Sequence, residues 1–555
     1  MRRDVVGRVM YGYRYSEVNP FNVKIDPGKI KSSCRVLASH IKMSECPKRL
    51  VASRTLPIYL DNSAEPKPCS NHPPSTVMGI LKRFATQPPK SSSIVLKCIN
   101  KFVDNFCRTM LDPLSAGDAE FDDWIVQINQ PNFRKEELRK VWNQAPYDDP
   151  AIVFRSCEIS SFVKDEFYSE IKPLRVINAR DDWFKCCSGP IFDAISKKVF
   201  SLPYFIKKIP VLERPTDILE SIWDLVSDVI NADATSYEAH FVEEVMDNIE
   251  FVLYDYMTER VPLYSHKMSY IKHVLKGPQV LKFKHMTVKL NATRMSGEMN
   301  TSLGNGFTTL MLNMFLSYVK KLKINIRAEG DDNLSRWQKS DFKPSAEEWE
   351  ELGWIMKIEE PAEANLGAFC GNVFDIDDKI VVTDPRTALR TFGWTGKRYV
   401  SAGRNLQLQL LRSKALSMAH QYNGCPLLGA FGRRVEKLTR GMTIRASVIN
   451  CMEQYKREQF QLYIKTPLPD YVEPPIGTRM LVENLYGIPI QDQVSFEHSI
   501  EHLELDCAFS FPWVEGTGPE RHFNDYTSPV GKQWFPPSEE DEQRLQQYLQ
   551  QFGST

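Results

Sequence analysis

The stretch INIRAEGDDNLSRW (324–337) places two short extended runs on either side of the turn-forming residues Gly330 to Asn333. This pattern predicts a β-hairpin with its turn at 330–333. The apolar run FTTLMLNMFLSYV (307–319) comes just before it. Its length and apolar density indicate a buried helix over 302–320. The fold is predicted outward from this helix and the hairpin that follows it.

Further elements flank this pair on both sides. VINA (229–232) is typical of a short buried strand, and WIMKIEE (354–360) alternates as a strand. Ser345 and Glu348 have the spacing of a capping box, which predicts a short helix between the hairpin and that second strand. Residues 368–383 look like another hairpin. This succession predicts an α+β fold, with helices packed on one face of an antiparallel sheet.

The rest of the chain is less regular. Helices are expected near 94–111 and 134–143, and residues 386–460 are expected to be mostly helical. The proline cluster and the serine run within 61–93 predict an irregular segment. A last helix is expected at 539–551 in a segment rich in proline and acidic residues.

The charge is balanced overall but unevenly distributed. The chain has 555 residues, 70 Lys and Arg against 70 Asp and Glu, and 42% apolar residues, which excludes a fibrous or wholly disordered protein. The length favours two to four subdomains. Residues 1–60 hold 12 basic against 4 acidic residues, 391–450 hold 10 against 1, and 461–555 hold 5 against 15. A basic body attracts phosphates, although single runs of charge are commonly solvated faces.

The cysteines and the apolar runs exclude several classes of protein. The 12 cysteines are irregularly spaced and form no CxxC pair, so we expect reduced thiols and no structural zinc. The start MRRDVVGRVM lacks the apolar core of a signal peptide. Because no apolar run reaches the length of a membrane span, we expect no transmembrane segment, with membrane association only through partners or an amphipathic surface.

Four local signals that could carry chemistry occur in one order. Each alone has a simpler explanation, such as a surface turn, a helix cap or a solvated charge, and only their combination and order favour a shared site. They are the basic series Lys164, Lys172, Arg175 and Arg180; Asp233 with Glu238; the SGxxxTxxxN pattern of Ser296, Gly297, Thr301 and Asn305; and the turn Gly330-Asp331-Asp332.

The combination indicates two-metal nucleotidyl transfer. An aspartate at a strand end and another in a hairpin turn can converge at one edge of a sheet and hold Mg²⁺, which prefers carboxylates, phosphates and water. Two such ions can activate a 3′-hydroxyl and stabilise the leaving pyrophosphate. The basic series suits a triphosphate. Thr301 and Asn305 are one helical turn apart, so they share a face and could hydrogen-bond a sugar hydroxyl.

This order resembles motifs F, A, B and C of viral RNA-dependent RNA polymerases. SGEMNTSLGN (296–305) with AEGDDNL (328–334) is most similar to positive-strand RNA viruses of the tombusvirus- and nodavirus-like group. The resemblance covers about 155–390. It implies a right-hand fold of fingers, palm and thumb, and it implies metal ligands and nucleotide-binding residues. The implied metal ligands are Asp233, Asp331 and Asp332. The implied nucleotide-binding residues are Lys164, Lys172, Arg175, Arg180, Glu238, Ser296, Gly297, Thr301 and Asn305.

The resemblance also implies two further features and one departure. Lys357 falls where motif D carries a lysine that protonates the pyrophosphate, although an exposed strand lysine is an equal alternative. FCGN (369–372) resembles motif E. Glu238 stands where the family usually has aspartate, so it keeps the acceptor chemistry but reaches one methylene further.

The expected organisation follows from the resemblance. The implied domains are an N-terminal extension bridging fingers and thumb (1–150), fingers (151–225), palm with a fingers insertion about 255–290 (226–385), a thumb whose basic residues track the product (386–500) and an acidic tail (501–555).

The expected function is an RNA-directed RNA polymerase that replicates and transcribes a viral RNA genome. It would use Mg²⁺, or Mn²⁺ in its place, with RNA template and product, ribonucleoside triphosphates and other viral replication proteins as partners. Its expected location is the host cytoplasm, at membrane-associated replication complexes. A non-catalytic RNA-binding scaffold that has kept the fold and a reverse transcriptase are the alternatives.

Overall fold

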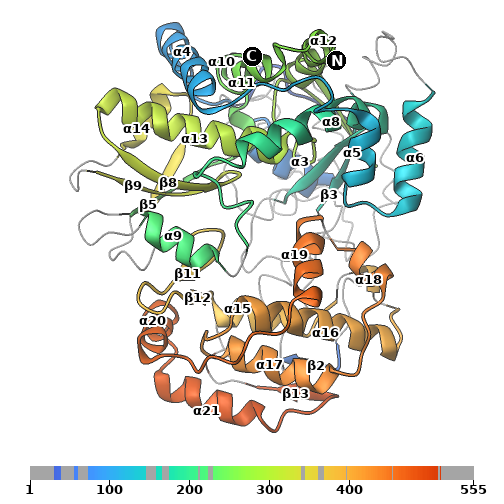
Figure 1. Cartoon of the computed structure of the whole chain (residues 1–555), viewed down its shortest axis with the longest axis vertical. Helices are drawn as coiled ribbons and strands as arrows, with labels where there is room; N and C mark the ends of the chain where they lie inside the picture. Colours follow the sequence, from blue (N-terminus) through green and yellow to red (C-terminus); the bar gives the residue numbers. More distant parts are fainter. Residues whose placement is uncertain are drawn as a thin grey trace, which may run out of the picture.

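A computed structural model describes a larger mixed body and a smaller helical body, which follow one another along the longest axis (Figure 1). The described residues are 30–38, 56–60, 73–144, 158–164, 174–210, 213–222, 229–284, 286–338, 344–359, 368–395, 397–399, 401–452, 454–510 and 513. The basic series member Lys172, the expected helix at 539–551 and most of the basic N-terminal residues lie outside them.

A four-stranded antiparallel sheet lies at the centre of the larger body. Its order is β10 (Met356–Glu359), β5 (Val229–Ala234), β9 (Asp332–Trp337) and β8 (Ile324–Glu329). The expected strands, hairpin and antiparallel sheet are therefore confirmed. The predicted four-residue turn is wrong, because Glu329 pairs with Asp332 and only Gly330 and Asp331 remain between the strands. Gly330 has φ +65°, a conformation that glycine adopts without steric cost.

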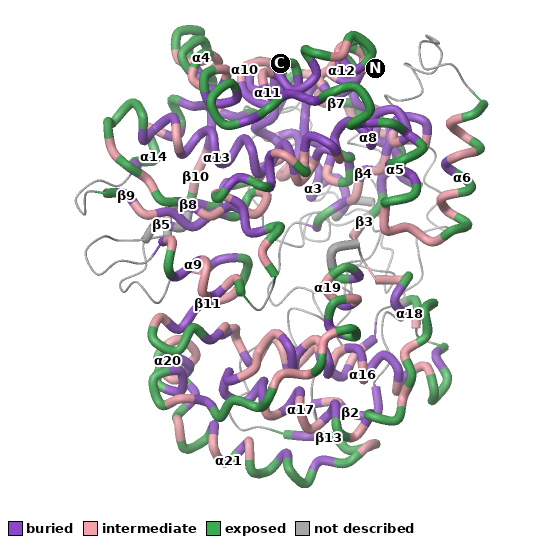
Figure 2. The backbone as a smooth tube through the Cα atoms, in the orientation of Figure 1, coloured by how far each residue is buried: buried purple, intermediate pink, exposed green. Residues whose placement is uncertain are grey.

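The predicted long helix is α13 (Thr301–Lys320), and it packs on this sheet. It is buried along most of its length, as Figure 2 shows. Because it is surrounded by other helices as well as the sheet, its sequence is apolar on nearly every side. The short helix α14 (Ala346–Glu351) begins at Ser345, whose side chain and that of Glu348 form the predicted capping box.

A second sheet of the larger body has five strands. Its order is β1 (Arg35–Ala38), β7 (Met286–Asn291), β6 (Pro278–Lys282), β3 (Glu158–Val163) and β4 (Val176–Arg180), with β3 and β6 parallel and the other pairs antiparallel.

Helix α3 (Pro73–Arg83) contributes to the core of this sheet, so the prediction of an irregular 61–93 is wrong there. Its two prolines occupy the first helical positions, where proline is tolerated, and Val77, Ile80 and Leu81 supply a helical apolar period.

The other helices of the larger body surround α13 and the two sheets. The predicted helices near 94–111 and 134–143 are confirmed as α4 and α6. The set is α4 (Ser93–Met110), α5 (Phe121–Gln127), α6 (Asn132–Trp142), α8 (Asp182–Val199), α9 (Arg214–Ile222), the 3-10 helix η3 (Tyr237–His240), α10 (Glu243–Asn248), α11 (Glu250–Thr258) and α12 (Pro262–Lys276).

The smaller body is mostly helical, as predicted for 386–460, but two helices beyond that range were not expected. Its elements are the antiparallel hairpin β11 (Val373–Phe374) and β12 (Val381–Val382), α15 (Pro385–Phe392), η5 (Lys397–Tyr399), α16 (Arg404–Gln421), α17 (Leu428–Thr439), α18 (Ala446–Asn450), α19 (Gln454–Lys465), α20 (Ile476–Tyr486), α21 (Ile490–Ile500), β2 (Ile58–Leu60) and β13 (Cys507–Phe509).

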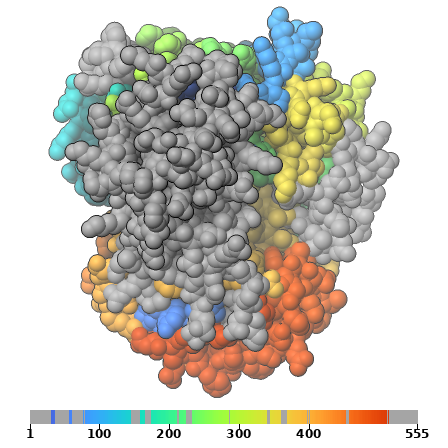
Figure 3. All heavy atoms as spheres, turned by 180° about the vertical axis from the view of Figure 1, so that it is seen from behind, coloured from blue at the N-terminus to red at the C-terminus, as the bar shows by residue number. Residues whose placement is uncertain are grey.

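The N-terminal strands are divided between the two bodies. β1 belongs to the five-stranded sheet, whereas β2 pairs in parallel with β13. Figure 3, a view from behind, shows the blue residues of β2 against the orange and red residues of the smaller body. Leu503 and Phe509 are buried in the same core, so the expected boundary of an acidic tail at residue 500 is wrong. The described part of the chain contains ordered, packed residues as far as β13.

The structure also bears on the cysteines and on the apolar character of the helices. Every cysteine among the described residues is a free thiol. None of the helices in the described ranges has both the length and the apolar character that crossing a membrane requires.

Candidate active site

Three aspartates meet at one end of the four-stranded sheet. β5 and β9 pair with Asn231 opposite Leu334, and the same antiparallel register continued by two residues sets Asp233 opposite Asp332. Asn333 Nδ2 donates to the carbonyl of Ala232 across 2.9 Å, which ties the two strand ends together. Asp331 occupies the adjoining turn. The strand end and the turn therefore converge as the sequence predicted.

The negative charges at this edge perturb one another. Asp331 is accessible to solvent, yet dense surrounding protein together with the charges of Asp332 and Glu238 raises its pKa to about 7. Burial and the charge of Asp233 also raise the pKa of Asp332. Crowded carboxylates of this kind are stabilised by a bound cation, and their hard oxygens suit Mg²⁺. The described residues do not form a preformed cluster of three metal ligands.

Arg175 is a basic residue whose positive charge acts on these carboxylates. It directly precedes β4, is exposed, and its positive charge lowers the pKa of both Asp331 and Asp332. Lys164 lies beside it, because the Lys164 backbone N–H donates to the Arg175 carbonyl across 2.9 Å. The two residues can thus face a common ligand near the aspartates.

Arg180 does not belong with them, and its predicted contact with nucleotide is wrong. Its side chain is 1% exposed, and it donates to Glu298 across 2.6 Å and to Gln279 across 2.5 Å. The reason is the two-residue period of a strand. Arg175 and Arg180 are five residues apart, so they point to opposite faces.

The loop before α13 is held by backbone and side-chain hydrogen bonds. The Asn178 N–H donates to the Ser296 carbonyl across 2.8 Å, and Ser296 Oγ donates to Glu238 Oε1 across 2.8 Å. Gly297 has φ +123°, and a Cβ there would lie 2.8 Å from the Asn178 carbonyl oxygen. Only glycine fits this position. The Glu238 carboxylate is thus bonded to Ser296, another residue of the predicted site.

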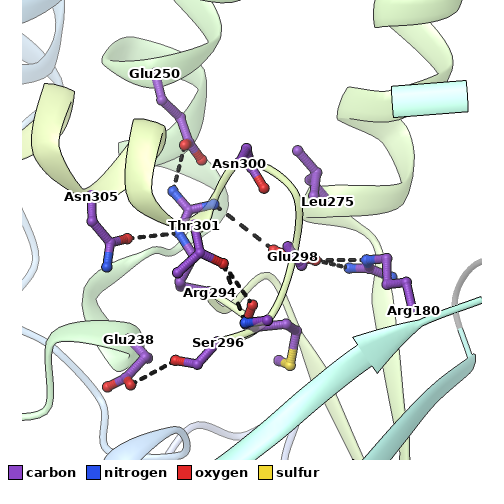
Figure 4. A network of polar contacts seen from close by, with 12 residues as sticks. Arg180, Glu238, Glu250, Leu275, Arg294, Ser296, Glu298, Asn300, Thr301 and Asn305 are labelled. Carbon is purple, nitrogen blue, oxygen red and sulfur yellow. Dashed lines mark hydrogen bonds and ion pairs between the residues drawn. The ribbon is translucent and has the colours of Figure 1, made fainter. Parts of the chain in front are cut away.

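Thr301 and Asn305 share the first turns of α13, as predicted, but both already have protein partners. Thr301 Oγ1 accepts from the Gly297 N–H and donates to the Met295 carbonyl, each across 3.3 Å. Asn305 Oδ1 accepts from Arg294 Nε across 3.0 Å. The contacts of Thr301 stabilise the loop, and those of Asn305 lead into a buried network (Figure 4).

The network contains charged residues that the sequence interpretation missed. Arg294 is ion-paired with Glu250, and Glu298 lies between Arg294 and Arg180. Arg294 and Glu298 flank the SGxxxTxxxN start at a spacing of four residues, which was the available sign of a local ion pair. Glu250 lies 44 residues from Arg294, and no pattern in the sequence links them.

Lys207 is a second residue that was missed. Its Nζ donates to Ser302 Oγ at the start of α13 and to Glu329 Oε1 across 3.2 Å, and it lies 4.9 Å from the centre of the Phe200 ring. It therefore joins the long helix to the residue just before the GDD turn.

The two remaining sequence features lie next to the aspartates. Lys357 is the direct antiparallel partner of Asp233. The Cys370 thiol, in the FCGN segment, hydrogen-bonds to Asp332, and burial followed by the charge of Asp332 raises the pKa of that thiol.

We expected the basic residues of 391–450 to track the product, but at least two of them bind backbone carbonyls of the smaller body. Lys414 Nζ donates to the carbonyls of Thr391, Phe392 and Trp394, across 2.6 to 3.1 Å. Arg434 donates to the Leu503 carbonyl across 2.9 Å through Nε. These contacts satisfy helix and loop carbonyls inside the smaller body.

Comparison with known proteins agrees with this geometry. Residues 171–395 match the family described as viral RNA-dependent RNA polymerase, and the segment contains Arg175, Asp233, Asp331 and Lys357. This segment is therefore related to viral RNA-dependent RNA polymerases, which confirms the resemblance drawn from the motifs.

Two relatives support the same conclusion. The chain is 28% identical over 257 residues to the RNA-directed RNA polymerase of Tobacco necrosis virus (strain A), covering 42% of this chain and 34% of the relative. It is 26% identical over 246 residues to the RNA-directed RNA polymerase of Oat chlorotic stunt virus (isolate United Kingdom), covering 41% and 33%. The match thus spans about a third of the length of these relatives.

Proposed function

We propose that the chain is an RNA-directed RNA polymerase that copies and transcribes a viral RNA genome from ribonucleoside triphosphates. The observation that carries the proposal is the meeting of Asp233, Asp331 and Asp332 at one sheet edge, within the segment that matches the polymerase family. Neither a solvated turn nor a strand cap accounts for the raised pKa values of Asp331 and Asp332, which result from burial and from the charges of the neighbouring carboxylates.

The three aspartates would hold divalent cations, Mg²⁺ or Mn²⁺ in its place. The raised pKa values of Asp331 and Asp332 support this assignment, because a cation would offset both the burial of these carboxylates and the repulsion among them. When bound, the ions would neutralise phosphate charge and activate the attacking 3′-hydroxyl.

The chain's own residues would position the nucleotide. Arg175 offers a planar fork to a phosphate, with Lys164 beside it and Lys172 in the same segment. Glu238, Ser296 and Asn305 would bind the ribose, while Gly297 and Thr301 maintain the loop that carries Ser296. Lys357 would donate a proton to the departing pyrophosphate.

The two bodies suit a right-hand arrangement. The four-stranded sheet with α13 would be the palm, the five-stranded sheet the fingers, and the smaller body the thumb. β1 and β2 support a bridging role for the N-terminal extension, since one strand lies in each body. The partners that go with this activity are template and product RNA and other viral replication proteins. The location that goes with it is a membrane-associated complex in the host cytoplasm.

Incorporation of labelled ribonucleotides on a short RNA template with Mg²⁺ tests the proposal. The expected result is a full-length complementary product that requires template. RNA binding with a steep salt dependence but without incorporation would instead support a non-catalytic scaffold. Equal use of deoxyribonucleotides would support a reverse transcriptase.

A further inference from the structure

Arg294 is an arginine with no access to solvent, directly before the Ser296–Gly297 loop. Its guanidinium lies 4.1 Å from the centre of the Phe241 ring and is ion-paired with Glu250, and both side chains are 0% exposed. Glu250 Oε2 also accepts from the Tyr254 hydroxyl across 3.0 Å. A buried charge needs such partners, so Arg294 is held in one place by contacts that it cannot exchange for water.

The contact between Arg294 and Asn305 determines which way the Asn305 amide faces. Arg294 Nε donates to Asn305 Oδ1 across 3.0 Å. An arginine side chain has donors and no acceptor, so the amide oxygen must face it and the amide NH₂ must face away. Figure 4 shows the Asn305 nitrogen on the side away from Arg294. The reverse orientation would set donors against donors.

The surrounding chain accommodates this pair closely. A Cβ on Gly304 would lie 2.4 Å from both Arg294 Nη2 and Glu250 Oε2, so the glycine lets the ion pair pack against α13. Glu298 Oε2 lies 3.9 Å from Arg294 Nη1, and Glu298 is also paired with Arg180. The two arginines and two glutamates together carry no net charge. A balanced network of this kind can keep Asn305 in one orientation during turnover.

We infer that Arg294, anchored by Glu250, is a positioning residue for ribose selection: it fixes the Asn305 amide so that its NH₂ is offered to the 2′-oxygen of the incoming nucleotide. The inference rests on the proposed polymerase function, in which Asn305 binds the ribose. A 2′-deoxyribonucleotide lacks the acceptor, so a fixed donor discriminates between the two sugars, whereas a rotating amide does so less well.

The test compares kcat/KM for ATP and 2′-dATP on one RNA template. In the double variant Arg294→Met/Glu250→Gln, Arg180 and Glu298 still balance each other. We expect its preference for ATP over 2′-dATP to fall about tenfold, mainly through a higher KM for ATP, as expected for loss of one oriented hydrogen bond. The matched control Arg479→Met/Glu497→Gln removes a largely buried ion pair of the smaller body and should keep the wild-type preference.

A cycle with Asn305→Ala makes the test specific. Asn305→Ala should lower the preference by a similar factor, and adding it to the double variant should lower it no further. Thermal unfolding reports whether each variant is folded. If the double variant does not fold, Arg294→Lys carries the same test, because a single ammonium held by Glu250 leaves Asn305 Oδ1 without its partner.

Two outcomes would overturn the inference while leaving the proposed function intact. One is an unchanged sugar preference in the folded variants. The other is an equal loss of activity with both nucleotides, which is the signature of a purely structural role. A wild-type chain that incorporates neither nucleotide would overturn the proposed function and the inference with it.

Discussion

Lys357 on β10 lies directly opposite Asp233 on β5 in the antiparallel pairing of these strands. Side chains in such a pair are on the same face of the sheet with Cβ atoms about 5 Å apart. Both residues are exposed. An exposed strand lysine would be unremarkable elsewhere, but here it shares a face with a candidate metal ligand.

We predict that Lys357→Ala lowers kcat about 100-fold and changes KM for nucleotide little, because a proton donor acts in the transition state. Steady-state incorporation on an RNA template measures both constants. The control Lys289→Ala removes an exposed lysine from β7, in the other sheet, and should be silent. If the two variants behave alike, Lys357 is an ordinary strand lysine.

Gly297→Ala should abolish nucleotide incorporation. The added Cβ meets the Asn178 carbonyl oxygen at 2.8 Å, and φ +123° is costly for alanine, so the loop that carries Ser296 must shift. We expect the free energy of unfolding to fall by about 1–3 kcal/mol, measured by urea denaturation. Gly441→Ala is the matched control, since a Cβ there meets nothing within 4 Å. Full activity in Gly297→Ala would refute the proposed constraint on the loop.

Two truncations separate the packed C-terminal residues from the acidic segment beyond them. A chain ending at residue 500 loses buried Leu503 and Phe509 and the β2–β13 pairing, so it should be less stable by about 3 kcal/mol or more. A chain ending at residue 513 keeps them and should match the full chain in thermal unfolding.

The longer of these truncated chains also tests the acidic segment. We expect its RNA affinity at low salt to equal that of the full chain, as for a segment that only aids solubility. A clear gain in affinity would instead show that the acidic residues compete with RNA.

Buried Lys31 should make stability depend on pH. Desolvation lowers its pKa from 10.5 to about 7, and its Nζ donates to Thr293 Oγ1 across 2.7 Å. Between these values the unfolded chain binds more protons than the folded chain, so the free energy of unfolding rises with pH. We expect wild type to gain about 2 kcal/mol relative to Lys31→Met between pH 7 and pH 9 in urea denaturation. Parallel pH profiles for the two proteins would contradict this.

Much of the fold and the site follows from local patterns in the sequence. The GDD hairpin, the capping box at Ser345 and the buried helix α13 depend on neighbouring residues, and the aspartates needed only a shared sheet edge to converge. The predicted nucleotide contact of Arg180 was wrong because it was inferred from the positive charge alone. The alternation of side chains along a strand places Arg180 on the buried face.

The rest depends on distant parts of the chain. β2 pairs with β13 across more than 440 residues, and Glu250 reaches Arg294 through the tertiary fold. No local period predicts such contacts. A run of basic residues in the sequence likewise does not reveal whether each side chain faces solvent or bonds within the protein. The ammonium of Lys414, for example, binds backbone carbonyls.

The most direct measurement is primer-free incorporation of ribonucleotides on a short RNA template with Mg²⁺, comparing wild type with Asp331→Ala. We predict a template-length product from wild type and a loss of at least about 1,000-fold in Asp331→Ala, the scale expected when a principal electrostatic contact of the transition state is removed. Unchanged incorporation in Asp331→Ala would show that the aspartates at this sheet edge do not perform the chemistry.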